Sequence, residues 1–231
     1  MEYKDFAKYY DIFYKKKDYK KEVEFLKKFI KKEDKIIDVG CGTGIHASIL
    51  EKDNYNIDGL DINVEMLNIA RTRLRGNLYN QNMLNINVNT KYDVIISMFA
   101  VINHLKNIKE LENTLKNFKK ILNINGKIII DLHNPQSSGE KIDIYDNIKR
   151  TMIWKYDKYT KIETSNIIFN INNKEYKTSH TFRIFNIEEI YKCCQKIGLE
   201  VIDIFENYDT NKIGNNSSKN IQFIIQSNNK I

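Results

Sequence analysis

The sequence has few cysteines, no long apolar run and no arginine-rich cluster. The three cysteines, Cys41, Cys193 and Cys194, have neither a metal-ligand spacing nor the pattern of a disulfide framework, so no metal is predicted. No run approaches the roughly 20 apolar residues that would span a bilayer. The N-terminal stretch MEYKDFAKYYD is charged and aromatic and lacks the apolar segment of a signal peptide. We therefore expect a cytoplasmic protein without a membrane partner.

The net charge of +7 comes from lysines that are spread over every predicted helix. Nucleic-acid-binding proteins usually gather their basic residues in one patch or stripe, so nucleic acid is an unlikely partner. The charge would suit a small anionic metabolite, for example one that is phosphorylated or nucleotide-linked. A length of 231 residues predicts one domain, which we expect to act as a monomer or a homodimer.

Short β-branched runs alternate with amphipathic helices through residues 31–135. Strands are predicted at 35–39, 56–61, 78–79, 92–97 and 127–131, with helices after the first two strands and at 107–122. This alternation predicts an α/β fold with a parallel sheet and right-handed crossovers.

The flanking segments have other patterns. Residues 1–30 predict an N-terminal helical cap, and residues 149–185 alternate apolar and polar as antiparallel strands do. Residues 186–231 predict a helix at 188–196 and a closing hairpin of strands 199–205 and 220–226, with a polar turn at 211–219. One domain, 1–231, would thus join a nucleotide-binding half (31–135) to an antiparallel insert, which we expect to cover it as a lid.

A glycine-rich loop directly follows the first predicted strand, as Asp-Val-Gly-Cys-Gly-Thr-Gly at 38–44. Glycines let the backbone turn sharply and approach a ligand closely. The helix that follows offers unpaired N–H groups and the positive end of its dipole. Asp61 ends the next strand, where an acid can accept hydrogen bonds from both ribose hydroxyls of an adenosine. The combination predicts a cofactor that contains adenosine.

Two cofactor classes use such a loop. The dinucleotide fingerprint G-x-G-x-x-G would need a glycine where this chain has Ile45. The acid that ends the strand, Asp38, would also repel a pyrophosphate, whereas it tolerates a cationic methionine group. The sequence therefore favours S-adenosylmethionine over NAD.

A second motif, Gly59-Leu60-Asp61-Ile62-Asn63-x-x-Met66-Leu67-x-x-Ala70, completes a recognisable pattern. With it, the chain resembles the class I S-adenosylmethionine-dependent methyltransferases, from the N-terminal helix to the last strand. The resemblance implies a Rossmann-like, seven-stranded, mostly parallel sheet of order 3-2-1-4-5-7-6 with strand 7 antiparallel.

The resemblance also implies which residues contact S-adenosyl-L-methionine. Asp38 and the glycine loop would surround the methionine and the ribose, Asp61 would hold the ribose hydroxyls, and Ile62 and Met66 would flank the adenine. Asn82 stands where these enzymes usually carry an acid that contacts the adenine amino group. Its side-chain oxygen can accept the same hydrogen bond, so we expect weaker binding rather than none. The expected set is Tyr19, Asp38, Gly40, Cys41, Gly42, Gly44, Asp61, Ile62, Met66, Asn82, Met83 and Met98.

Within the class, the chain is most similar to the N,N-dimethyltransferases of nucleotide-linked amino sugars. This closer resemblance lies in Tyr10-Asp11-x-x-Tyr14, Lys17-Asp18-Tyr19, Gly42-Thr43-Gly44-x-His46 and the run from Ser97-Met98-Phe99 to His104-Leu105. It implies that His104 and an N-terminal tyrosine, Tyr3 or Tyr14, lie near the acceptor amine as catalytic residues.

Two further residues are candidates for binding the acceptor. His133 follows a strand at the carboxyl edge of the sheet, where ligands of open α/β sheets bind. Arg183 would face the site if the insert is a lid, and its planar guanidinium suits a phosphate or a carboxylate. The competing interpretations are a packing role for His104 and for His46, one turn into the helix after the glycine loop, and a solvated surface position for Arg183.

Three functions stay open at this point. The leading hypothesis is S-adenosylmethionine-dependent methyl transfer to a nitrogen or oxygen of a small, polar, anionic metabolite such as a nucleotide-linked amino sugar. An RNA or protein methyltransferase would be expected to carry a further binding module or a motif such as Asn-Pro-Pro-Tyr, where this chain has Ser97-Met98-Phe99-Ala100. A non-catalytic S-adenosylmethionine-binding protein is disfavoured by the complete glycine loop and by Asp61.

Overall fold

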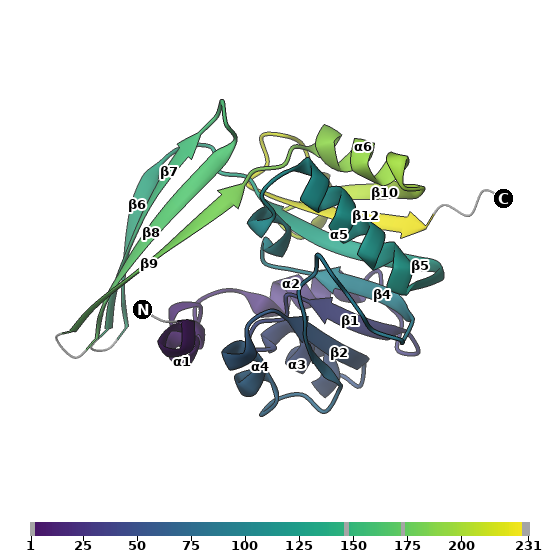
Figure 1. The fold of residues 1–231 in the computed structure, drawn as a ribbon, viewed down its shortest axis with the longest axis horizontal. Coiled ribbons are helices and arrows are strands. Elements are labelled where there is room, and N and C mark those ends of the chain that lie inside the picture. The colour runs from purple at the N-terminus through teal and green to yellow at the C-terminus, as the bar shows by residue number, and fades with distance from the viewer. Residues whose placement is uncertain (1–2, 146–147, 172–173, 228–231) are drawn as a thin grey trace.

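A mixed β-sheet runs through the centre of the protein (Figure 1). The computed structural model describes residues 3–145, 148–171 and 174–227, without the side chains of residues 3–6 and 8. In the described residues the sheet has eight strands in the order β11-β10-β12-β5-β4-β1-β2-β3. These are β1 (Lys35–Val39), β2 (Asn56–Asp61), β3 (Leu78–Asn80), β4 (Tyr92–Ser97), β5 (Leu122–His133), β10 (Leu199–Glu206), β11 (Asp209–Ile213) and β12 (Asn220–Ser227).

The strand directions agree with the predicted α/β topology. Strands β1 to β5 pair in parallel, and β12 lies antiparallel between β5 and β10. Seven strands therefore follow the expected order 3-2-1-4-5-7-6, with β12 as strand 7 and β10 as strand 6.

The eighth strand, β11, corrects the prediction of seven strands and of a polar turn over 211–219. It pairs with β10 at the sheet edge. Asn207 (φ 52°) and Tyr208 (φ 58°) are both left-handed and form the tight turn between the two strands, the geometry that a two-residue hairpin needs. The turn lacks glycine and β11 is polar, so neither gave a strand signal in the sequence.

Helices cover both faces of the sheet. On one face α2 (Tyr19–Lys27), α3 (Ile45–Lys52) and α4 (Val64–Ala70) pack against side chains that include Ile36, Val94 and Ile96. On the other face α5 (Ile108–Ile121) and α6 (Ile187–Lys196) bury Phe118 and both Cys193 and Cys194. No helix in the described residues is long and apolar enough to cross a membrane.

The insert is a separate four-stranded antiparallel sheet that projects from the carboxyl edge of the central sheet (Figure 1). Its strands are β6 (Gly139–Tyr145), β7 (Ile148–Asp157), β8 (Ile162–Ile171) and β9 (Lys174–Arg183). The predicted insert at 149–185 therefore starts too late. The first strand, β6, was missed because it is an edge strand whose two isoleucines, Ile142 and Ile144, point to solvent.

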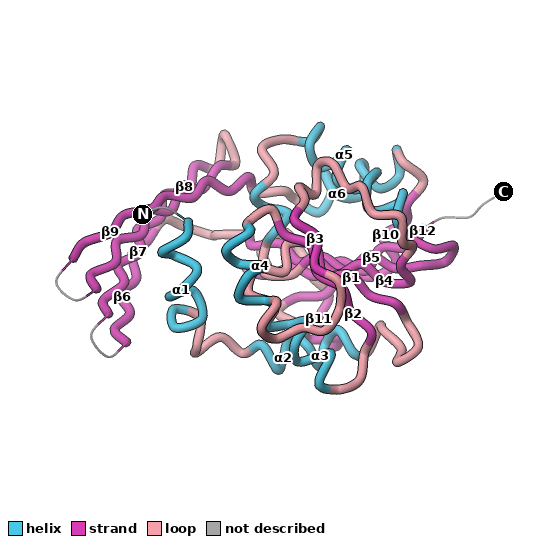
Figure 2. Tube along the Cα trace, turned by 60° about the horizontal axis from the view of Figure 1, so that its bottom comes forward, coloured by secondary structure: helices cyan, strands magenta, loops and turns pink. Residues whose placement is uncertain are grey.

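The N-terminal helix α1 (Tyr3–Phe13) lies between the insert and α4, as both views show (Figures 1 and 2). Phe13 stacks on Phe169 of β8 with 4.3 Å between ring centroids. Met66 and Ile69 of α4 belong to the same apolar cluster. The predicted N-terminal cap thus joins the insert to the α/β core.

Candidate active site

The glycine loop forms a tight backbone turn between β1 and α3. Gly40 has φ 79° and Gly42 has φ 54°, which side chains rarely allow. A Cβ atom on Gly40 would lie 2.5 Å from Val101, whereas one on Gly42 would meet nothing within 4 Å. The side of Gly42 is thus open, as close approach by a ligand requires. Gly44 (φ 77°) instead packs against Ala70 and Leu74.

Asp61 organises this loop from the end of β2. Its carboxylate accepts hydrogen bonds from the backbone N–H of Gly42 (2.8 Å) and of Asn63 (2.8 Å). Burial raises the pKa of Asp61, and these backbone donors oppose that effect. Carboxylate oxygens can accept about four hydrogen bonds in total, so Asp61 retains capacity for a ligand.

A cavity of about 1390 Å³ extends from the glycine loop to the inner face of the insert. A single small ligand usually occupies roughly 300–1000 Å³, so this cavity has room for a cofactor and an acceptor together. Of the predicted cofactor contacts, all line it except Asp38 in β1 and Gly44 at the start of α3. Those that line it are Tyr19, Gly40, Cys41, Gly42, Asp61, Ile62, Met66, Asn82, Met83 and Met98.

Two buried polar atoms near the loop fit a bound cofactor. In the described residues the hydroxyl of Tyr19 and one carboxylate oxygen of Asp38 are buried without a hydrogen-bond partner, which is rare for polar groups in folded proteins. Burial raises the pKa of Asp38 to about 7. A hydrogen-bond acceptor of a ligand would satisfy the Tyr19 hydroxyl, which lines the cavity. A positive group of the ligand would favour the ionised form of Asp38 from inside the cavity without contacting it, and the methionine part of S-adenosylmethionine supplies both groups.

Apolar and amide side chains line the cavity around the end of β2. Met66 and, at the end of β4, Met98 are almost fully buried and also line the cavity, so both pack in the core and border the cavity. Ile62 is 67% exposed at the cavity wall. The side-chain oxygen of Asn82 accepts a hydrogen bond from the N–H of Leu84 (2.9 Å), which fixes the orientation of its amide.

The comparisons with known proteins agree with this geometry. A family model of a methyltransferase domain matches residues 10–204. The chain belongs to the S-adenosylmethionine-dependent methyltransferases.

Individual relatives of this methyltransferase include curated proteins and a solved structure. A dTDP-3-amino-3,4,6-trideoxy-alpha-D-glucopyranose N,N-dimethyltransferase of Streptomyces venezuelae is 29% identical over 134 residues, and the match spans only 56% of that relative and 55% of this chain. An uncharacterised protein of Methanocaldococcus jannaschii is 30% identical over 217 residues, 90% of this chain and 79% of that protein. A crystal structure of an S-adenosylmethionine-dependent methyltransferase from Clostridium acetobutylicum has the same fold, with TM-score 0.85 at 22% identity over 98% of this chain and 99% of that chain.

On the acceptor side of the methyltransferase cavity, aromatic rings surround two of the predicted residues. Tyr14 lies 4.9 Å from Phe99 between ring centroids. His104, in the 3-10 helix η1 (Val101–His104), lies 4.8 Å from Phe182 of the insert. The His104 side chain is exposed to the cavity, but desolvation by the protein atoms around it, with a smaller effect of His180, lowers its pKa to about 4. His104 is therefore neutral at physiological pH.

His133 also lines the cavity, at the end of β5. Its Nε2 atom lies 3.1 Å from a carboxylate oxygen of Glu163 on β8. The sequence singled out His133, but Glu163 was missed because nothing local marks a glutamate in an alternating strand as a site residue.

The structure does not bring Arg183 into the cavity. The guanidinium of Arg183 donates to Glu189 (2.9 Å), because the N-terminal capping of α6 holds that carboxylate beside the end of β9. Arg183 does not line the cavity, which corrects its predicted placement. Tyr3 begins α1, and its side chain lies outside the described residues.

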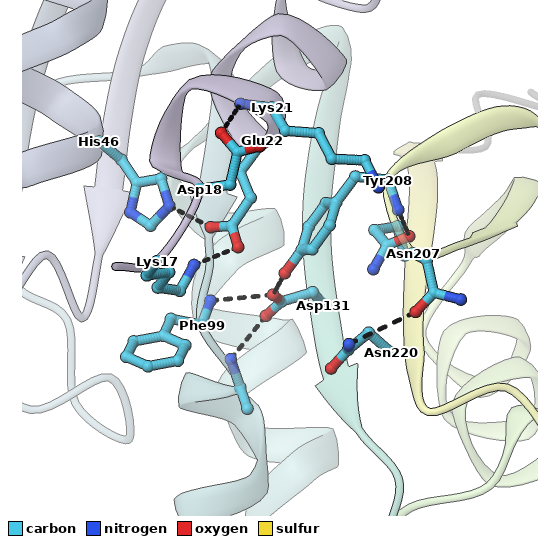
Figure 3. A network of polar contacts seen from close by, with 12 residues as sticks. Lys17, Asp18, Lys21, Glu22, His46, Phe99, Asp131, Asn207, Tyr208 and Asn220 are labelled. Atoms are coloured by element: carbon cyan, nitrogen blue, oxygen red, sulfur yellow. Dashed lines mark hydrogen bonds and ion pairs between the residues drawn. The ribbon is translucent and has the colours of Figure 1, made fainter. Parts of the chain in front are cut away.

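A carboxylate that the sequence analysis did not select shapes the loop beside the sulfonium position. Asp131 of β5 accepts the N–H groups of Phe99 (3.0 Å) and Ala100 (2.6 Å) and the hydroxyl of Tyr208 (Figure 3). Phe99 (φ 66°) and Ala100 (φ 58°) are both left-handed, a conformation that costs about 1–2 kcal/mol per residue without glycine. Asp131 thus holds two strained residues at the cavity wall.

A second missed group lies beside the glycine loop. Glu22 of α2 pairs with Lys17 and with His46, whose Nε2 atom is 2.6 Å away (Figure 3). Burial opposes ionisation of Glu22, but His46 and Lys17 hold its pKa below the usual value. His46, for which packing and function were both open, is thus buried in an ion-paired cluster that lines the cavity.

A polar link connects α1 to the loop. Asp11 accepts a hydrogen bond from the Thr43 hydroxyl (2.7 Å) and forms an ion pair with Arg73. Arg73 also donates to the carbonyl of Thr43 (3.0 Å). Helix α1, which Tyr14 directly follows, is therefore fastened to the glycine loop.

Proposed function

We propose that this chain transfers the methyl group of S-adenosylmethionine to a nitrogen or oxygen of a small polar metabolite such as a nucleotide-linked amino sugar. The observation that carries the proposal is the single cavity that joins the glycine loop to the inner face of the insert. A cofactor and an acceptor held at its two ends would meet beside Met98 and Phe99.

The bound cofactor supplies an activated methyl group on its sulfonium, so the protein has only to align the acceptor and exclude water. Tyr14, Phe99 and Phe182 form an aromatic surround for the acceptor. His104 is neutral and can accept a hydrogen bond from the attacking amine or hydroxyl, which orients its lone pair.

The nature of the acceptor is supported by the relatives and by the rim of the cavity. The Streptomyces venezuelae relative is named for an amino-sugar substrate linked to dTDP. Lys106 and Lys219 line the cavity and are exposed, so they could neutralise a phosphate at the rim in place of Arg183. An RNA or protein acceptor is less suited, because the insert and α1 enclose the acceptor end on two sides.

Calorimetric titration with S-adenosylmethionine and S-adenosylhomocysteine tests the cofactor, followed by assay of methyl transfer to dTDP-linked amino sugars. We expect micromolar binding that Asp61→Ala weakens by about 100-fold, because the variant loses charge-assisted hydrogen bonds to the ligand and to the loop. An unchanged dissociation constant in Asp61→Ala would refute the assignment. Binding without transfer to any acceptor would favour a non-catalytic binding protein.

A further inference from the structure

We propose that Glu163 is a specificity-determining residue that selects acceptors with an amino group, which binds beside it in the ammonium form and releases one proton to water before the neutral nitrogen attacks the methyl group. The inference rests on the proposed function, since it concerns the acceptor end of the same cavity. It assigns a role to a residue of the insert rather than to the cofactor-binding core.

Glu163 is a buried carboxylate in the cavity wall. It is only 4% exposed, and its one hydrogen bond in the described part of the chain joins it to Nε2 of His133 at 3.1 Å. An ionised carboxylate can accept about four hydrogen bonds, and leaving a buried charge unpaired is costly. One hydrogen bond from the imidazole fills only a quarter of that capacity, which leaves Glu163 able to accept hydrogen bonds from a ligand.

Three basic side chains in and beside the insert pair with other carboxylates. Arg183 and Lys161 both pair with Glu189, each at 2.9 Å. Arg150, at the other end of β7, pairs with Asp143. Among the residues that the structure describes, no lysine or arginine pairs with Glu163, and His133 is its one basic neighbour within ion-pair distance. The carboxylate is therefore open to a cationic group of a ligand.

The surroundings of Glu163 suit a cationic group and disfavour an anion. Phe182 lies directly across from Glu163 in the β8–β9 pairing, and Trp154 of β7 lines the same cavity. Aromatic faces attract ammonium groups. His104, which contacts Phe182, is neutral at physiological pH, so it adds no positive charge that would repel an amine.

Charge therefore divides the acceptor end into two regions. The buried carboxylate lies against the inner face of the insert, while the cavity lysines, Lys106 and Lys219, are exposed. A metabolite with an amine at one end and a phosphate at the other would match both regions. A metabolite that presents a carboxylate or phosphate toward His133 would be repelled by Glu163.

The single tryptophan of the chain, Trp154, supplies a probe in this cavity. With S-adenosylhomocysteine at saturation, its fluorescence is titrated with 3-amino-3-deoxy-D-glucose and with D-glucose, which differ only by an amine in place of a hydroxyl. We expect the amino sugar to bind at least about tenfold more tightly, since hydrogen bonds between ions are about twice as strong as neutral ones. A wild-type protein that treats the two sugars alike, or responds to neither, would overturn the proposal.

Glu163→Gln separates the charge of this residue from its packing role. Its amide oxygen can still accept the hydrogen bond from His133, but the negative charge is gone. We expect the preference for the amino sugar to fall toward one, with the affinity for S-adenosylhomocysteine within twofold of wild type. Glu140→Gln is the matched control, because Glu140 is exposed on β6 of the same insert and does not line the cavity.

His133→Gln provides a second variant if Glu163→Gln does not fold. It retains the carboxylate, so the preference for the amine should persist, and its loss would contradict the assignment to Glu163. If Glu163→Gln kept the preference for the amino sugar, that result would also contradict the assignment to Glu163. Failure of cofactor binding would overturn the proposed function, whereas normal cofactor binding without amine preference would overturn this inference alone.

Discussion

Replacing Asp38 by asparagine should stabilise the free protein at alkaline pH and weaken its affinity for the cofactor. Asp38 is 2% exposed, and one of its carboxylate oxygens has no hydrogen-bond partner in the described residues. Burial raises its pKa from 3.8 to about 7, with smaller opposing and reinforcing effects of His46, Asp61 and Asp131. The folded protein therefore disfavours the ionised form.

The sign of the pH dependence follows from this raised pKa. The neutral carboxyl contributes its stability fully below pH 3.8, and the contribution is lost as the pH rises through about 7. One pKa unit corresponds to about 1.36 kcal/mol, so the whole effect is about 4 kcal/mol. Between pH 5 and pH 8 about 2.5 kcal/mol of it is lost.

Urea unfolding of wild type and Asp38→Asn at half-unit intervals from pH 5 to pH 8 isolates this residue. The stability difference between Asp38→Asn and wild type should grow in favour of the variant by about 2.5 kcal/mol from pH 5 to pH 8, because folded wild type increasingly has to ionise a buried carboxyl that the asparagine lacks. Asp203→Asn, at an exposed position of β10, is the control and should give a flat difference. Parallel stability curves for wild type and Asp38→Asn would refute the reasoning.

Cofactor binding provides an independent check on Asp38. A positive group of S-adenosylmethionine near this carboxylate would lower its pKa, so binding at pH 7 should release about half a proton, because the free protein is then about half protonated. Calorimetry in buffers of different ionisation enthalpy measures this release. The same experiment on Asp38→Asn should show weaker binding and no release from this site.

Three further predictions concern the surrounding cavity. His104→Gln should lower turnover roughly 10- to 100-fold with little change in cofactor affinity, and normal turnover in the variant would favour a packing role. The turnover of wild type should not fall as the pH drops through 6.5, since the pKa of His104 is lowered to about 4. Asp11→Asn should weaken cofactor binding by up to about tenfold by loosening α1 from Thr43 and Arg73, and rapid-mixing kinetics should place the change in dissociation. Ala100→Gly should raise stability by up to about 1 kcal/mol because it relieves the left-handed strain, whereas a lower unfolding midpoint would show that the alanine side chain is needed.

Local patterns of the sequence were sufficient for the sheet core and the cofactor loop. The strands β1, β2 and β4 are continuous buried runs, and the glycine loop lies where β1 ends, so neighbouring residues alone indicated both features. Asp61 could be assigned because the end of β2 follows the loop at a fixed position in this fold. Cys193 and Cys194 pack on the buried face of α6 with Ile190.

Weakly patterned segments could not be read in this way. Strand β6 presents its isoleucines to solvent, and β11 is polar, so hydrophobic alternation gives little signal for either. Their pairing with β7 and β10 is decided by backbone hydrogen bonds at sheet edges, which tolerate many side chains.

What the sequence by itself determined is the α/β class, the order of the elements and the loop that receives the cofactor, because each depends on residues that are close along the chain. The tertiary structure alone decided the partners of the charged groups. It pairs Glu163 with His133, ties Asp131 to Tyr208 and turns Arg183 to Glu189 rather than to the cavity. Such pairings depend on where separate strands and helices come to lie, and a charge removed from water is stable only where the fold supplies its partner.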